Sequence, residues 1–96
     1  MTKVIIITNQ NKLSELQVAL EKLGVTGLTV TNVLGHGMQK GNPTFFRGAP
    51  METRLLPKVK IDVVVCKIPT ETIFEAVQKV IYTGKIGDGK IFIYDV

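Results

Sequence analysis

The sequence predicts an α+β domain in which four strands and two helices follow one another in the order βαββαβ. Apolar, β-branched runs open and close each half of the chain, and each half holds one stretch where apolar residues recur every three or four positions. The length of 96 residues suits one domain with a single modest core. This order is typical of an antiparallel four-stranded sheet with both helices on one face.

The first half of the chain predicts a strand, a helix and a second strand. Val4–Ile7 is a continuous apolar run, as expected for a central strand buried on both faces. Asn11 is a suitable N-cap for a helix that Gly24 would end. Leu28–Leu34 alternates in part and predicts the second strand. The apolar stripe of the helix consists of Leu13, Leu16, Leu20 and Leu23.

The middle of the chain, Gly35–Pro57, shows no sustained period. It contains four glycines and three prolines, which predict a long irregular loop. Loops of this length are uncommon in compact domains and are usually functional or disordered.

The second half repeats the plan of the first. Lys58–Cys66 predicts a strand, Thr70 can cap a helix that ends by Gly84, and Lys90–Val96 predicts the last strand. The helix has apolar residues on one side at Ile73, Val77, Val80 and Ile81. The whole order is the ferredoxin-like one, which leaves one sheet face bare. We assign four residues to that face, where sister subunits would cover them: Val63, Val65, Ile91 and Ile93.

The loop Thr83–Lys90, T-G-K-I-G-D-G-K, is the clearest candidate for a ligand site. Its three glycines let a ligand approach the backbone, and its two lysines add positive charge, as in an anion cradle. The spacing from Gly84 to Lys90 also matches a P-loop. However, Ile91 stands where a P-loop needs Ser or Thr, and the segment runs from helix to strand. We therefore reject the P-loop and retain a phosphate cradle.

Composition narrows the class of ligand. The net charge of +4 comes from scattered lysines and arginines, which favours anionic small molecules over nucleic acid. Cys66 is the single cysteine, so no intrachain disulfide can form and a reducing compartment is expected. The apolar run near the start is too short for a signal peptide or a membrane span. We expect a cytoplasmic protein.

Four segments resemble the PII (nitrogen regulatory) signal-transduction proteins, in the family's order and over the whole chain. They are T-V-T-N-V-L-G-H-G-M-Q-K-G, F-R-G-A, L-P-K-V-K-I-D-V-V-V and T-G-K-I-G-D-G-K-I-F-I-Y. The resemblance implies a homotrimer with ADP or ATP in the clefts between subunits. It further implies a non-catalytic regulator of a target protein, either a membrane transporter at its cytoplasmic face or a metabolic enzyme.

The resemblance also assigns the parts of a single domain, 1–96. Residues 35–57 would be the T-loop, which docks on the target, and residues 83–90 the B-loop, which holds phosphates. Gln39 would coordinate Mg²⁺ through the nucleotide, and Gln39 with Lys58 would hold 2-oxoglutarate. The implied nucleotide-binding residues are Thr29, Gly35, Gly37, Met38, Gln39, Asp62, Val64, Gly87, Asp88, Gly89 and Lys90. The implied docking residues are Phe45, Phe46, Arg47 and Met51.

The chain departs from the family pattern at several positions. Met38 replaces an arginine that can approach the terminal phosphate, and Asn9 replaces a common arginine near the metabolite site. Ala49 and Met51 replace the serine and tyrosine that some members modify. The arginines of the family's C-terminal segment have no counterpart up to Val96. We expect a divergent member with weaker or less selective nucleotide binding.

Other functions fit the residues less well. An RNA-binding domain of the same order would need aromatic residues on its central strands, and V-I-I-I supplies none. An acylphosphatase-type enzyme would need an arginine or a nucleophile in the first loop, and His36 has no ligand partner nearby in sequence. A PII-like trimer that binds another anionic metabolite or a metal, and a weak ATPase, remain as alternatives.

Overall fold

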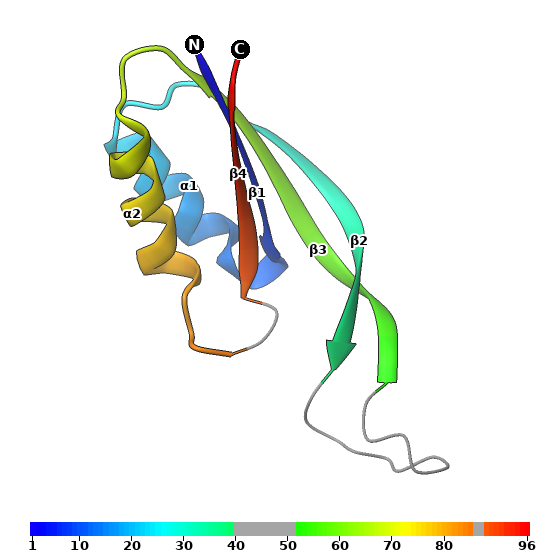
Figure 1. Cartoon of the computed structure of the whole chain (residues 1–96). Helices are drawn as coiled ribbons and strands as arrows, with labels where there is room; N and C mark the ends of the chain where they lie inside the picture. Colours follow the sequence, from blue (N-terminus) through cyan, green and yellow to red (C-terminus); the bar gives the residue numbers. More distant parts are fainter. Residues whose placement is uncertain (40–51, 86–87) are drawn as a thin grey trace.

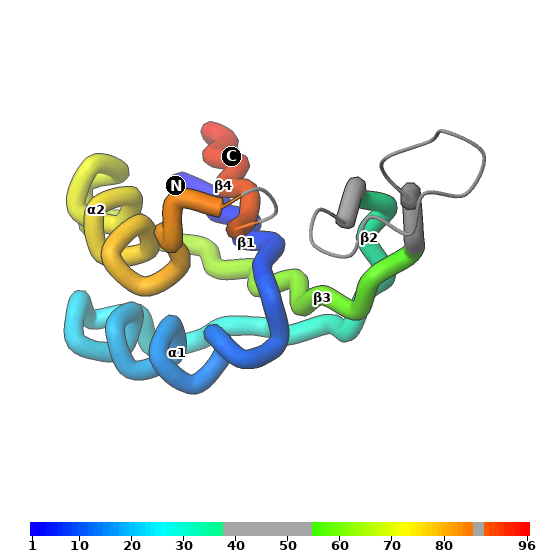
Figure 2. Tube along the Cα trace, turned by 90° about the horizontal axis from the view of Figure 1, so that it is seen from below, coloured from blue at the N-terminus to red at the C-terminus, as the bar shows by residue number. Residues whose placement is uncertain are grey.

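The computed structural model describes residues 1–39, 52–85 and 88–96. The four strands form one antiparallel sheet in the order β2-β3-β1-β4, and both helices lie on the same side of it (Figures 1 and 2). The predicted ferredoxin-like fold is confirmed. The elements are β1 (Thr2–Asn9), a 3₁₀ turn (Gln10–Lys12), α1 (Leu13–Lys22), β2 (Thr29–Gln39), β3 (Glu52–Val65), α2 (Thr70–Ile81) and β4 (Gly89–Asp95).

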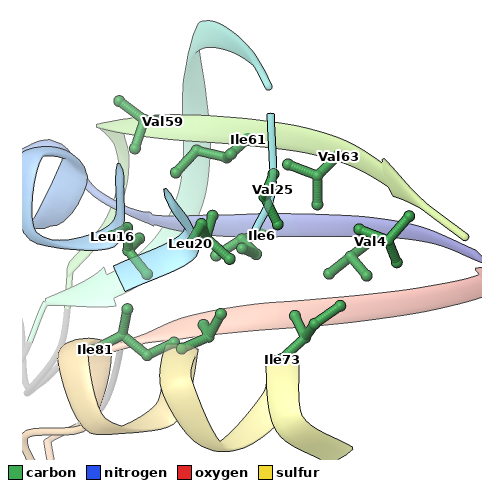
Figure 3. Close-up of a cluster of buried hydrophobic side chains, with 12 residues drawn as sticks. Val4, Ile6, Leu16, Leu20, Val25, Val59, Ile61, Val63, Ile73 and Ile81 are labelled. Carbon is green, nitrogen blue, oxygen red and sulfur yellow. The ribbon is translucent and has the colours of Figure 1, made fainter. Parts of the chain in front are cut away.

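The core lies between the sheet and the two helices (Figure 3). On β1, Val4 and Ile6 are fully buried, whereas Ile5 and Ile7 are half-buried on the opposite face. We expected this strand to be buried on both faces. Within the single chain, only the face toward the helices is fully buried. Val25, which lies between α1 and β2, also belongs to the core. The other core residues are Leu16 and Leu20 of α1; Val59, Ile61, Val63 and Val65 of β3; and Ile73, Val77 and Ile81 of α2.

We call the face of the sheet away from the helices the open face. The residues on it differ from those predicted. Val63 pairs with Val4 across the sheet and is 1% exposed, and Val65 is also buried, so both belong to the core. Ile91 packs against the core, and Ile93 lies on the same face of β4. Alternation groups residues of one face but does not say which face the helices cover. On β1, β3 and β4, the apolar residues of the open face include Ile5, Ile7, Val64, Phe92 and Tyr94.

Strands β2 and β3 extend further than predicted. The segment expected to be irregular from residue 35 to residue 57 contributes 35–39 to β2 and 52–57 to β3. β1 pairs with β3 only from Lys58 onward, so beyond this point β2 and β3 pair with each other and run past the rest of the sheet (Figure 1). Pro57 lies where β3 has one neighbour, a position that tolerates a missing N–H.

The predicted helices are confirmed, but their starts differ. The 3₁₀ turn brings Lys12, not Asn11, to the N-cap of α1. Pro69 is the N-cap of α2, and Thr70 is its first helical residue. Gly24 follows α1 at a φ of 95°, which glycine adopts without strain, so its predicted role as the stop is confirmed.

Candidate functional site

Most of the predicted ligand residues lie on the open face of the sheet, because the strand register places them on the same side of it. Asp62 is flanked by Thr29 of β2 and Ile5 of β1. Lys90 pairs with Ile7, two residues further along β1. Since alternate residues of a strand share a face, these positions form one surface. Predicted site residues on this surface are Thr29, Gly35, Gly37, Gln39, Lys58, Asp62, Val64 and Lys90.

The spacing along this surface fits a nucleotide. Val64 pairs with Lys3, and Lys90 pairs with Ile7, four residues later on β1. At about 3.3 Å per residue, the two rows are roughly 13 Å apart along the strands. A ligand of about this length would span the surface from Val64 and Asp62 to Lys90.

The open face carries an excess of positive charge. Lys3, Lys58, Lys60 and Lys90 share it with Asp62. Lys3 Nζ lies 3.9 Å from Asp62 Oδ1 in a partly exposed ion pair, which stabilises the fold by at most about 1 kcal/mol. An anion on this face would meet an attractive field.

Lys58 is held at the end of β1. Its Nζ donates a hydrogen bond of 2.5 Å to Asn9 Oδ1. A Cβ at Gly35 would lie 3.2 Å from Lys58 Cγ, so the glycine makes room for the lysine side chain. The ligand role predicted for Gly35 stays a prediction, and the structure shows this packing role.

The carboxylate of Asp88 is engaged inside the 83–90 loop. Its Oδ2 accepts hydrogen bonds from the backbone N–H of Thr83 at 2.8 Å and of Gly84 at 3.1 Å. Its Oδ1 accepts a bond from the Thr83 hydroxyl. The Thr83 hydroxyl, then its N–H, hold the pKa of Asp88 below its usual value, so this carboxylate is ionised at neutral pH.

The same loop is fastened to β1 by two contacts. Thr8 is fully buried, and its Oγ1 donates a 2.6 Å hydrogen bond to the carbonyl oxygen of Asp88. At Gly89 an added Cβ would lie 2.7 Å from the carbonyl oxygen of Ile7. Sequence reasoning missed Thr8, because a threonine at the end of an apolar strand is unremarkable without its partner.

Several predicted residues cannot be placed. Gly87 and the docking residues Phe45, Phe46, Arg47 and Met51 lie outside the described residues, as do the side chains of Met38 and Gln39. The register sets Gln39 opposite Glu52, the last pair of the ladder between β2 and β3. In the described ranges, no group of three or more His, Cys, Asp or Glu could hold a metal ion.

Comparison with known proteins covers the whole chain. A family model described as "Nitrogen regulatory protein P-II" matches residues 1–96. The chain is 45% identical over 96 residues to nitrogen regulatory protein GlnK of Escherichia coli K12 and to nitrogen regulatory protein P-II of Pasteurella multocida, spanning 100% of this chain and 86% of each relative.

Solved structures agree with the sequence comparison. The structure of B. subtilis GlnK matches with a TM-score of 0.79 at 40% identity, over 99% of this chain and 83% of that one. The B. subtilis GlnK-ATP complex matches with a TM-score of 0.80 at 39% identity, over 99% and 80%. Within the described residues, no helix has the length and apolar character needed to cross a membrane.

Proposed function

The chain belongs to the nitrogen regulatory protein P-II family, and from this premise we propose that it senses ADP or ATP and regulates a target protein. The observation that carries the proposal is the lysine-rich open face beside the 83–90 loop, whose two ends are joined by the hydrogen bonds of Asp88. The ATP complex of a protein that is 39% identical supports an adenine nucleotide as the ligand. The sites would lie between the subunits of a homotrimer.

In this proposal the two ends of the nucleotide meet different residues. The phosphates lie against the backbone near Gly89, where β4 begins, and near the ammonium group of Lys90 on the open face. The nucleoside lies near Thr29, Asp62 and Val64, where the Asp62 carboxylate can accept a hydrogen bond from a hydroxyl or an amino group.

The response to the nucleotide would be transmitted through β2 and β3. Beyond Lys58 these strands pair only with each other, as far as Gln39 and Glu52. We call the segment 35–57 the arm. The arm would bind a membrane transporter at its cytoplasmic face or a metabolic enzyme. Mg²⁺ would act at Gln39, where it neutralises phosphate charge, and 2-oxoglutarate would bind near Lys58. A ligand shifts the arm only by its differential affinity for two arm conformations.

Calorimetric titration of ATP and ADP into the wild type and Lys90→Ala tests the nucleotide site. Loss of a charge-assisted bond of about 1.5–3 kcal/mol should weaken binding roughly 10-fold or more. Lys79→Ala is the matched control, since Lys79 is an exposed lysine in the last turn of α2. Absence of binding to the wild type at millimolar nucleotide, or equal affinity in Lys90→Ala, would overturn the proposed site.

A non-catalytic role is part of the proposal. Incubation of the protein with ATP and Mg²⁺ should release no phosphate above that of a Lys90→Ala sample. Phosphate release that is saturable in ATP and absent from the variant would favour the weak ATPase.

A further inference from the structure

We propose that Thr8, Thr83 and Asp88 are positioning residues that shape the phosphate site without contacting the phosphates. We call their hydrogen bonds the clasp. The inference deepens the proposed function and rests on it, because it explains how the 83–90 loop is held ready for an anion. It assigns to Asp88 an indirect role in place of direct contact with the ligand.

The first half of the clasp closes the loop. The single Asp88 carboxylate accepts three hydrogen bonds, from the N–H and hydroxyl of Thr83 and from the N–H of Gly84. These donors follow the end of α2 at Ile81. Asp88 lies five positions after Thr83, so the bonds tie the start of the loop to its end. Because the clasp holds Thr83, Gly84 and Asp88 in place, these residues lose less entropy when a ligand binds.

The second half of the clasp fixes the exit of the loop to the sheet. The buried Thr8 hydroxyl donates to the Asp88 carbonyl oxygen at 2.6 Å. The next residue, Gly89, lies so close to Ile7 that a Cβ would fall 2.7 Å from its carbonyl oxygen. Lys90 follows directly and pairs with Ile7. The anchored backbone therefore sets where the Lys90 side chain starts on the open face.

Electrostatics support an indirect role for Asp88. A carboxylate pointing at phosphates would repel them. Here the carboxylate accepts hydrogen bonds from three donors of the loop itself, which stabilise its charge. The lowered pKa of Asp88 agrees with these bonds, the Thr83 hydroxyl being the largest cause. The negative charge is thus used to hold the loop, and Lys90 remains available for the anion.

The clasp can be tested without any nucleotide. Carboxyl carbon NMR of the full chain should give a pKa for Asp88 below that of a free aspartate. Thr83→Val keeps the shape of the side chain and removes the hydroxyl, so it should raise this pKa toward the usual value. Thr83→Ser keeps the hydroxyl and should retain the low pKa. An Asp88 pKa that is the same in the wild type and Thr83→Val would overturn the clasp.

The positioning role is tested by ATP calorimetry on the same proteins. Thr83→Val loses the bond from the hydroxyl to Asp88 and the bond that the hydroxyl accepts from the Lys85 N–H. Thr8→Val loses one bond, to the Asp88 carbonyl oxygen. Both variants should bind about three- to ten-fold more weakly. Thr83→Ser and Thr8→Ser should bind within about two-fold of the wild type, since they keep the donor. Thr72→Val, at an exposed threonine of α2, is the matched control and should bind like the wild type.

The outcomes separate the two proposals. If the wild type binds ATP and both valine variants bind equally well, positioning is overturned while the proposed function stands. If the wild type does not bind ATP, the proposed function falls and the positioning role falls with it, even where NMR confirms the clasp. Thermal unfolding should show folded variants, because valine replaces threonine without a change of shape. A Thr8→Val protein that is folded and binds weakly supports the proposal.

Discussion

At Gly89 the chain has no room for a side chain, and this gives the first prediction. In Gly89→Ala the new Cβ would lie 2.7 Å from the Ile7 carbonyl oxygen and 3.1 Å from Ile81 Cδ1. Separation of β4 from β1 should destabilise the fold by about 1–3 kcal/mol in urea unfolding. Gly27→Ala is the control, because nothing lies within 4 Å of its Cβ position. Equal stability of the two variants would contradict the close approach.

Single residues also show where sequence reasoning stops. The resemblance assigned Asp88 and Gly89 to the phosphate loop from the string G-D-G-K. That string cannot reveal that the Asp88 carboxylate bonds to Thr83, or that Thr8, eighty positions away, bonds to its carbonyl oxygen. Such bonds depend on the β1–β4 register, which a tertiary fold sets.

At the scale of elements, the two faces of β3 give the second prediction. Val63 is 1% exposed in the core, whereas Val64 is 53% exposed on the open face. Val63→Asp would bury an unpaired charge and should abolish the cooperative fold, measured by circular dichroism. Val64→Asp should stay folded, since its partner across the sheet is Lys3. It should disrupt subunit association, because its charge would enter the interface.

Light scattering after gel filtration measures the second effect. The wild type should have three times the 10.6 kDa mass of the chain, and Val64→Asp a smaller mass. A Val64→Asp protein that unfolds like Val63→Asp, or that keeps the mass of the wild type, would show that the open face is not the subunit interface.

Element boundaries were predictable where local chemistry decides them. The apolar stripes gave both helices, and Gly24 gave the end of α1. The strand ends at residues 35–39 and 52–57 were missed, since glycines and Pro57 there interrupt the alternation. Pairing between β2 and β3 stabilises the extended conformation of these residues despite their low strand propensity. A local sequence pattern does not show which strand will pair with them.

For the whole molecule, the order of elements predicted the sheet and the side of the helices. It did not predict which strand residues face the helices, and Val63 and Val65 were assigned to the wrong face. Periodicity divides a strand into two sets, and only packing chooses between them. The corrected division sharpens the proposed function, because it places Lys58, Lys60 and Lys90 together with Thr29 and Asp62 on one surface.

The most direct test of nucleotide sensing at this surface is an amide NMR spectrum of the labelled full chain, recorded with and without ATP. The account predicts shifts of Thr83–Lys90 and of the strand positions Thr29, Asp62 and Val64, with the exposed sides of α1 and α2 unchanged. Shifts confined to the helices, or no shifts at millimolar ATP, would contradict it.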